Sequence, residues 1–362
     1  MRVLVATVVH DPRDARIAAR EIASLLAAGH RVTYLAPFQH FGVTPMPGVE
    51  CVDVPAAHGR HRFSALVAAT RTLRKMAPDH DVLLLHSPEL LLAVATLTHR
   101  CIVWDVHEDL PASISLKGWI PKPLRSITQQ LARRMELRAE AHYHLLLAEH
   151  SYQQRFHDSH PVIPNSTTVP AVVPAVGGDR IVYVGHVTRA RGGVEMLEVA
   201  QQLHGEVSVH LIGSVDREMT APVRAAQERG EVIWHGYVAN EQALAMIEGA
   251  IAGLALLHDE PNYRHSRPTK IMEYLAHGVP VIATNLPVTK ALIEDSGGGE
   301  VVGFGDTNAV VDIVRRWRAD PALGQTFADT GREWVTTHMN WANDGVRFVS
   351  QLQEWSQPTQ RG

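Results

Sequence analysis

The chain has 362 residues and a formal charge of −4, with 34 Lys and Arg against 38 Asp and Glu. Apolar residues make up 45% and charged residues 20% of the chain, a globular composition that excludes a disordered, collagen-like or low-complexity protein. The near-neutral charge gives no general attraction to DNA or RNA, so we expect no nucleic-acid partner. The length favours two domains, because one hydrophobic core rarely serves more than about 250–300 residues.

Export and membrane signals are missing from the sequence. The apolar stretch at the start spans about seven residues, shorter than the apolar region of a signal peptide. No stretch approaches the roughly 18 apolar residues of a transmembrane helix. Two cysteines form no disulfide framework and suit a reducing compartment. We therefore expect a cytoplasmic protein.

The first half of the chain alternates strand-length apolar runs with helical patterns. The runs lie at 2–9, 31–37, 81–87 and 101–107, and a helical apolar spacing between the first two ends at Gly29. Strands that are apolar on both faces and alternate with helices predict a parallel sheet covered on both sides.

The same pattern restarts after a segment rich in Pro, Gly, Ser and Thr at 160–179. New strands are predicted at 180–186, 207–213, 231–237, 251–257 and 279–284. We therefore predict a Rossmann-like domain at 1–165, a linker at 166–179, a second Rossmann-like domain at 180–340, and a final helix within 341–362 that returns to the first domain. Two such doubly wound α/β domains bind ligands at the carboxyl ends of their strands, in the cleft between them.

A dinucleotide-binding domain is disfavoured, because no G-x-G-x-x-G follows the first strand. Segment 267–284 is more informative: Pro268 begins a short helix that Gly278 ends. The amino end of a helix suits a diphosphate, and Lys270 adds a cation there. Glu273 lies one turn further and can accept hydrogen bonds from vicinal hydroxyls such as those of a ribose. The alternative is an ordinary packed helix with a surface salt bridge between Lys270 and Glu273.

Four segments in the same order along the chain, 11–37, 101–111, 162–169 and 181–197, together with 267–284, resemble the retaining glycosyltransferases of family 4. The resemblance implies the GT-B fold, in which two Rossmann-like, doubly wound parallel-sheet domains face a central cleft. It implies transfer of a sugar from a nucleoside-diphosphate sugar to an acceptor hydroxyl with retention, in enzyme class EC 2.4. It also implies no catalytic metal and no cofactor, the co-substrate being a UDP- or GDP-sugar.

Residue roles follow from the matching positions. Glu273 matches the second Glu of the family's E-x7-E motif, whereas His265 stands where the first Glu would be. Arg191 and Gly192 match a Lys-Gly pair that lies against the diphosphate, and His186 replaces an Arg there. Arg191 and Lys270 are thus expected to stabilise the leaving group, although a loop arginine can equally be solvated. The other expected donor-binding residues are Gly185, Gly236, Tyr237, Thr269, Ile271 and Met272.

The first domain supplies the remaining candidates. His107 matches a family histidine that lies near the donor sugar and the departing phosphate, so we expect a catalytic role; a purely structural hydrogen bond is the alternative. Glu108 and Asp109 follow it directly and can orient it or bind the acceptor. Weaker acceptor-side candidates are Asp14, Arg16 and His86. No His/Cys cluster has metal-ligand spacing, and the D-x-D-like residues 79–81 precede a strand instead of following one, which favours a turn.

Two other functions are compatible with the sequence. A related nucleotide-sugar 2-epimerase would need acid and base carboxylates near the sugar, and a silent sugar-nucleotide-binding subunit would explain His186 and His265. The acceptor is expected to be a saccharide, a lipid-linked saccharide or a small molecule, and the protein a monomer or homodimer. The basic, apolar-interleaved stretch 117–138 suits peripheral membrane contact, or else an ordinary domain helix.

Overall fold

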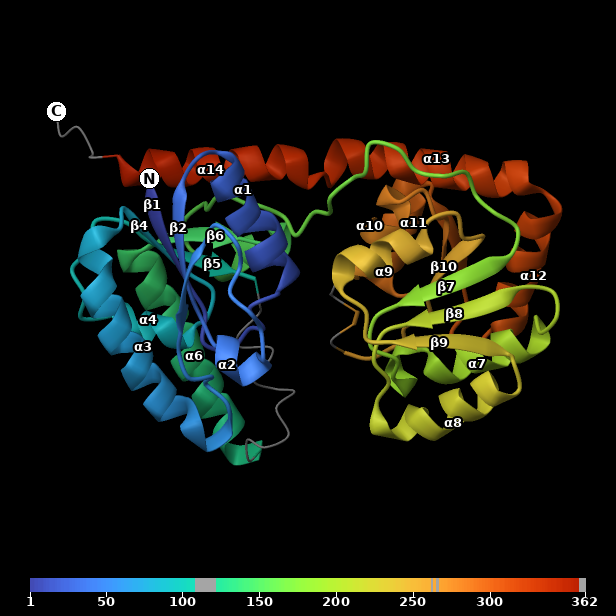
Figure 1. Cartoon of the computed structure of the whole chain (residues 1–362), viewed down its shortest axis with the longest axis horizontal. Helices are drawn as coiled ribbons and strands as arrows, with labels where there is room; N and C mark the ends of the chain where they lie inside the picture. The colour runs from blue at the N-terminus through green and yellow to red at the C-terminus, as the bar shows by residue number, and fades with distance from the viewer. Residues whose placement is uncertain (108–121, 262, 265–266, 358–362) are drawn as a thin grey trace. The chain divides into compact units, whose positions relative to one another are not determined.

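The computed structural model describes all residues except 108–121, 262, 265–266 and 358–362. The chain divides into two compact units, residues 1–165 with 343–362, and residues 166–342 (Figure 1). Each unit contains a six-stranded sheet in which every pair of neighbouring strands is parallel. This confirms the predicted class of two doubly wound α/β domains.

In the first unit the strand order is β3-β2-β1-β4-β5-β6. The strands are β1 (Arg2–Ala6), β2 (Arg31–Ala36), β3 (Glu50–Asp53), β4 (Val82–Leu85), β5 (Ile102–Val106) and β6 (His144–Leu147). The helices are the π-helix η1 (Ala15–Ile22), α1 (Ala23–Ala27), α2 (Phe38–Phe41), α3 (Arg62–Met76), α4 (Glu89–Val94), α6 (Lys122–His142) and α14 (Trp341–Ser356). A core on one face of this sheet joins residues of α3, α4 and α6 to strand residues such as Leu4 and Leu83.

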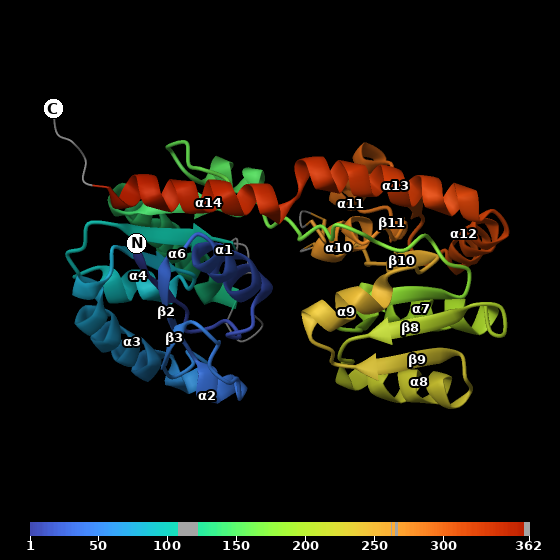
Figure 2. The same cartoon turned by 45° about the horizontal axis from the view of Figure 1, so that its top comes forward.

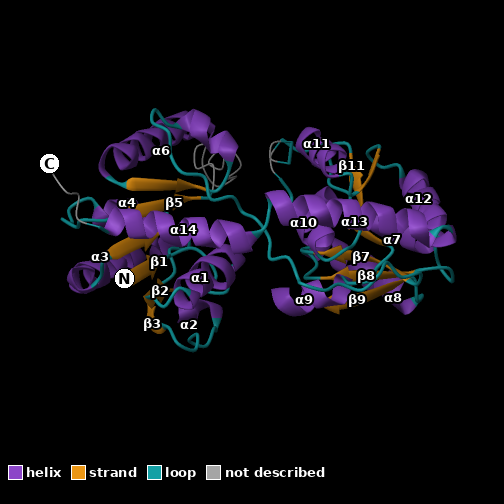
Figure 3. Ribbon diagram, turned by 90° about the horizontal axis from the view of Figure 1, so that it is seen from above, coloured by secondary structure: helices purple, strands orange, loops and turns teal. Residues whose placement is uncertain are grey.

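In the second unit the order is β12-β11-β10-β7-β8-β9. The strands are β7 (Arg180–Val184), β8 (Ser208–Ile212), β9 (Val232–Gly236), β10 (Ala252–Ala255), β11 (Val281–Thr284) and β12 (Gly299–Val302). The helices are α7 (Gly193–Gln202), α8 (Arg217–Glu228), α9 (Asn240–Ile247), α10 (Thr269–Ala276), α11 (Pro287–Ser296), α12 (Thr307–Ala319) and α13 (Pro321–His338). One core packs α7, α8 and α12 on the sheet, and a second packs α9, α10, α11 and α13 (Figure 3).

The final helix α14 is part of the first unit, as predicted (Figure 2). Its Phe348 and Leu352 are fully buried, and the Trp355 ring stacks on His144 with centroids 4.5 Å apart. Gln353 and Ser356 contact His30 and Met1. The last helix of the chain thereby contacts residues near its start.

Strand ends differ from the sequence-based expectation. The strand predicted at 2–9 ends at Ala6, because the Val8 amide donates to Ser87 Oγ (2.9 Å) instead of to a neighbouring strand. The short strands β3, β6 and β12 were not predicted; β3 and β12, at the sheet edges, have partly exposed residues and lack a long apolar run.

Gly253 illustrates how tightly the second sheet packs on α10. A Cβ atom on Gly253 would lie 2.5 Å from the Tyr274 ring, whereas one on Gly178 would meet no atom within 4 Å. We predict that Gly253→Ala lowers the free energy of unfolding by about 1–3 kcal/mol through overpacking. Thermal melting of Gly253→Ala beside Gly178→Ala tests this; equal melting temperatures would contradict the packing argument.

Candidate active site

The loop between β7 and α7 is held close to its neighbours by glycines. Gly213 lies so near this loop that a Cβ atom on it would be 2.1 Å from the Gly185 carbonyl oxygen. Gly192 has a positive φ of 82° and adjoins β10, since a Cβ atom there would lie 2.3 Å from the Leu256 carbonyl oxygen. The ends of β7, β8 and β10 are therefore brought together at the carboxyl edge of the sheet, where only residues without side chains fit.

Two cations occupy this edge. The Lys270 ammonium lies 3.7 Å from the centre of the Tyr183 ring, and it is buried with no hydrogen-bond partner among the described residues. Burial lowers the pKa of Lys270 well below its usual value, the charge of Arg191 lowers it further, and Glu273 opposes the shift. The side chain of Arg191 interacts electrostatically with the hydroxyl groups of Tyr263 and Tyr183.

A buried cation is ordinarily paired with an anion. Here two cations adjoin each other, and Gly185 leaves room beside Lys270, with a hypothetical Cβ atom 3.4 Å from the ammonium nitrogen. The arrangement therefore suits an anionic ligand with more than one charged oxygen. The structure thus brings Arg191, Lys270 and Gly185 together.

Helix α10 positions the other donor-side candidates. Pro268 precedes its first residue, and Gly278 follows it in the left-handed conformation with a φ of 67°. Glu273 is 9% exposed on the second turn. Tyr274 fixes the helix to the sheet by accepting the Val184 amide (2.8 Å).

Ile271 and Met272 need a correction as donor-binding side chains. Both are buried in the core that α10 shares with α9 and α11. The Ile271 amide also donates to the Pro268 carbonyl (3.2 Å), so it is not a free donor at the helix end. Their contribution is to hold α10 in place.

The remaining donor-side candidates are more exposed. His186 is exposed and its Nδ1 lies 2.7 Å from Ser214 Oγ. Gly236 ends β9 with a φ of 70°, Tyr237 after it is 67% exposed, and Thr269 opens α10. His265 lies outside the described residues.

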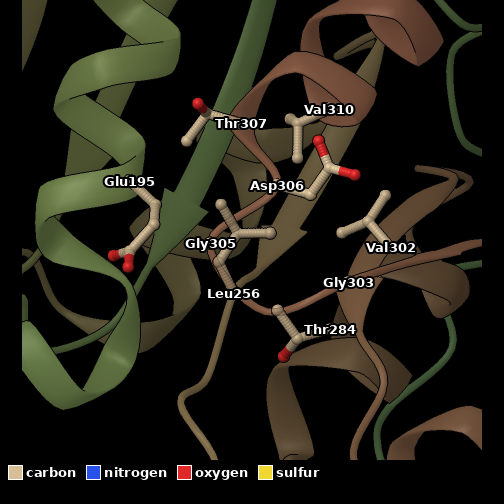
Figure 4. Close-up of a pocket in the computed structure, with 9 residues that line it drawn as sticks. All are labelled: Glu195, Leu256, Thr284, Val302, Gly303, Gly305, Asp306, Thr307 and Val310. Carbon is tan, nitrogen blue, oxygen red and sulfur yellow. The ribbon is translucent and has the colours of Figure 1, made fainter.

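A small pocket lies beside this loop, between α7 and the start of α12 (Figure 4). Its volume of about 10 Å³ is that of roughly one water molecule, so a sugar nucleotide does not fit there. Glu195 lines it and accepts a hydrogen bond from His258 Nε2 (2.8 Å). The His258 amide in turn donates to the Ala190 carbonyl (2.9 Å). These two hydrogen bonds of His258 connect the segment after β10 to the β7–α7 loop and to α7.

In the first unit, Asp105 organises a buried polar cluster at the end of β5. Arg16 donates to both Asp105 carboxylate oxygens at 2.7 Å, and both side chains are buried. His107 Nδ1 lies 3.0 Å and His86 Nδ1 3.2 Å from Asp105 Oδ2. Burial alone would raise the pKa of Asp105, but the Arg16 guanidinium and the donated hydrogen bonds hold it well below its usual range.

The cluster contains one further acid, Glu21, whose neutral form is favoured. Glu21 is fully buried, 3.1 Å from Arg16 Nε and 3.3 Å from His86 Nε2. Burial and the neighbouring Asp105 charge raise the pKa of Glu21 well above its usual value, while burial lowers that of His86 to about 4. Burial thus favours the neutral forms of Glu21 and His86, and the charges of Arg16 and Asp105 oppose each other.

His107 is the member of this cluster closest to solvent, with 11% of its side chain exposed. Its Nδ1 faces the Asp105 carboxylate, so this nitrogen carries a proton. Its Nε2 lies 3.0 Å from His10 Nε2, which also lies 3.2 Å from the His86 carbonyl oxygen and therefore donates. In neutral His107 the Nε2 lone pair faces away from the carboxylate and can accept a proton.

Atoms of His86, Asp105 and His107 lie within 4.8 Å of one another, close enough to suggest a metal site. Arg16, however, already bonds both oxygens of Asp105, and its charge opposes a second cation at the same carboxylate. These residues do not fit a metal.

Two acceptor-side predictions need correction. Arg16 is 3% and His86 1% exposed, so neither side chain reaches an acceptor; both support Asp105 instead. Asp14 caps the first helix by accepting the Arg16 and Ile17 amides. Glu108 and Asp109 lie outside the described residues.

Several residues that contact the predicted site residues were not identified from the sequence. Tyr183 and Asp105 each lie within an apolar strand run, where nothing but their polar type marked them. Glu21 and His10 are separated from Asp105 by most of the first domain's sequence. Polar residues inside an apolar run were the available signal.

Comparison with known proteins gives a family match for the second unit and similar folds for the whole chain. Residues 178–320 match the protein family described as "Glycosyl transferases group 1". Comparison with curated protein sequences gives no match.

Solved structures match over almost the whole chain. Sucrose-phosphate synthase from Thermosynechococcus elongatus is 16% identical with a TM-score of 0.71, covering 98% of both chains. HepE from Anabaena, solved with UDP-glucose, is 13% identical with a TM-score of 0.68, covering 98% of this chain and 100% of that one. WaaG, a glycosyltransferase involved in lipopolysaccharide biosynthesis, is 13% identical with a TM-score of 0.68, covering 97% and 99%. This likeness confirms the predicted GT-B fold.

The neutral state of Glu21 has a consequence for stability. A carboxyl group whose pKa is higher in the folded than in the unfolded protein makes stability fall as pH rises between the two pKa values. We predict that Glu21→Gln, which stays neutral, gains stability relative to the unmodified protein as pH rises from 5 to 8. The gain is about 1.4 kcal/mol for each pH unit over which Glu21 alone stays protonated in the folded state.

Urea unfolding at several pH values measures this difference. Glu294→Gln is the matched control, because Glu294 is exposed on α11 and pairs only with Lys290 at 3.7 Å. A constant difference between Glu21→Gln and the unmodified protein across the pH range would show that Glu21 is ionised in the folded state.

Proposed function

We propose that the chain is a member of the glycosyl transferases of group 1, which its residues 178–320 match, and that it transfers the sugar of a UDP- or GDP-sugar to an acceptor hydroxyl with retention of configuration. The buried Lys270 ammonium carries this proposal, since it lies beside Arg191 and has no hydrogen-bond partner among the described residues, with Glu273 as its only opposing charge there. The diphosphate of a nucleotide sugar supplies the missing negative charge. HepE, whose structures hold UDP and UDP-glucose, is among the proteins of the same fold.

Each donor-side residue has a distinct part in the proposal. Arg191 and Lys270 bind the diphosphate and stabilise the charge that develops on it as the glycosidic bond breaks. Glu273 accepts hydrogen bonds from the ribose hydroxyls. Gly185 and Gly192 allow the β7–α7 loop to approach the phosphates closely.

In this proposal the fixed cations help the diphosphate to depart. The acceptor hydroxyl attacks the sugar on the face from which the diphosphate leaves. A phosphate oxygen of the departing diphosphate accepts the acceptor's proton. In the first unit Asp105 holds His107 in one orientation, and we propose a catalytic role for His107. The acceptor itself, whether saccharide, lipid-linked saccharide or small molecule, is assigned to the first unit.

Diphosphate binding is the direct test of the site. We predict that Arg191→Ala and Glu273→Ala each weaken binding of the preferred nucleoside diphosphate by at least about tenfold, or roughly 1.4 kcal/mol. Calorimetry with UDP, GDP, ADP and dTDP measures the affinities. Arg189→Ala is the matched control, because Arg189 is two residues away, exposed, and 3.7 Å from Glu218. Unchanged affinity in both site variants would remove the site assignment.

Turnover with a panel of nucleotide sugars separates the alternative functions. Formation of a glycoside whose anomeric configuration matches that of the donor supports retaining transfer. Interconversion of the donor sugar without any acceptor would indicate an epimerase. Tight binding with neither product nor donor hydrolysis would indicate a silent binding subunit. That alternative would explain why His186 and His265 stand at positions where the family has charged residues.

Membrane contact is a second interaction that we propose for this protein. None of the helices in the described part of the chain is both long and apolar enough to span a bilayer. On α6, Ile127 and Leu131 are 56% and 58% exposed, and Arg134 and Arg138 continue the same exposed face at helical spacing. We propose that this face lies on an anionic bilayer, with the two apolar side chains inserted at the headgroup level.

Vesicle co-sedimentation tests this surface. We predict binding to phosphatidylglycerol vesicles, loss of binding in Ile127→Asn/Leu131→Asn, and little binding to phosphatidylcholine, because both apolar insertion and anionic charge contribute. Ile233→Asn on β9, an exposed apolar residue of the second unit, serves as the control. Equal recovery of all three proteins with the vesicles would contradict the assignment.

A further inference from the structure

Tyr183 contacts both of the cations assigned to the diphosphate. The centre of its ring lies 3.7 Å from the Lys270 ammonium nitrogen, and its hydroxyl group interacts with the neighbouring Arg191 side chain. The same hydroxyl donates to the His186 carbonyl (3.0 Å), so its single proton is already committed. The oxygen lone pairs therefore face Arg191.

The position of Tyr183 in the fold makes these contacts rigid. It is fully buried at the penultimate position of β7, within the core that packs α7 against the sheet. Burial raises the pKa of its hydroxyl to about 12, so it stays a neutral acceptor for Arg191. A neutral acceptor orients a guanidinium without cancelling its charge, which a carboxylate would do.

The ring serves Lys270 in a similar way. An aromatic face attracts a cation through its quadrupole, by about 0.5–2 kcal/mol depending on exposure, and supplies no negative charge. A carboxylate at this place would form an ion pair that a diphosphate must break. The ring holds the ammonium where it can still exchange this contact for phosphate oxygens.

We propose that Tyr183 is a positioning residue for the glycosyl-transfer reaction, which places Arg191 through its hydroxyl and Lys270 through its ring for one diphosphate. This inference rests on the proposed function, because it requires that the two cations bind the donor diphosphate. The contact with Arg191 requires the hydroxyl group of Tyr183, whereas the contact with Lys270 requires its aromatic ring. Substitutions can therefore separate them.

A double-mutant cycle tests the hydroxyl. We predict that Tyr183→Phe weakens binding of the nucleoside diphosphate, the tightest of UDP, GDP, ADP and dTDP, by about fivefold in the unmodified protein. In the Arg191→Ala background the same change should have almost no effect, because the hydroxyl acts through the guanidinium. Equal weakening in both backgrounds, or none in the unmodified protein, would overturn the positioning role of the hydroxyl.

A second cycle tests the ring. Tyr183→Leu should weaken diphosphate binding beyond Tyr183→Phe when Lys270 is present, and no further in a Lys270→Met background. Because Phe keeps the ring, it rescues this part of the loss. If Leu and Phe bind the diphosphate equally well, the ring does not position Lys270.

Control variants distinguish positioning from general destabilisation. Tyr274→Phe removes another buried tyrosine hydroxyl, one that bonds the Val184 amide instead of a cation. It should lower the melting temperature without coupling to Arg191→Ala. The starting variants also separate the two levels of inference: Arg191→Ala without effect on diphosphate binding refutes the proposed site, whereas a strong Arg191→Ala effect with additive Tyr183→Phe refutes only the role of Tyr183.

Discussion

Parallel strands place the loops that follow them at one edge of the sheet, and the candidate site depends on this constraint. In the second unit the ends of β7, β8 and β10 meet there, and glycines allow backbone to lie against backbone. The amino end of α10 begins at the same edge. Tyr183, Arg191 and Lys270 thereby lie close together, although they come from separate parts of the chain.

The two units bury charge in opposite ways. In the first, the charges of Arg16 and Asp105 oppose each other, and burial favours the neutral forms of Glu21 and His86. A cluster that is neutral as a whole is compatible with a dry interior and holds its members in fixed orientations. The cluster is suited to orienting His107, which is the most exposed of the residues that contact the Asp105 carboxylate.

In the second unit the positive charges of Lys270 and Arg191 are surrounded by phenol groups and an aromatic face, which do not neutralise them. Such a site has a cost in the free protein, since Lys270 is desolvated, has no hydrogen-bond partner among the described residues and lies beside a second cation. The cost is recovered when an anion binds. Uncompensated charge in a folded protein is therefore better evidence for a ligand than a complete salt bridge would be.

The pattern of apolar runs predicted most strands and the division into two α/β domains, because buried parallel strands have a strong and local signature. Strands β3, β6 and β12 were missed; β3 and β12 are short and partly exposed, with pairing that depends on distant partners. The helix in segment 267–284 was predicted almost to the residue, since Pro268 and Gly278 act locally. Arg16 and His86 were assigned to the acceptor because sequence shows that a polar residue follows a strand but does not show which way it points.

The sequence by itself thus determined the elements, the family resemblance and the candidates Arg191, Lys270 and Glu273, all of which depend on neighbours within a few positions. The tertiary structure decided the partners: Asp105 with Arg16 and His107, Glu21 with His86, and Tyr183 with both cations. Burial and distance fix whether a charge is cancelled or left available for a ligand. Those quantities arise only when residues far apart in the chain are brought to the same edge of a sheet.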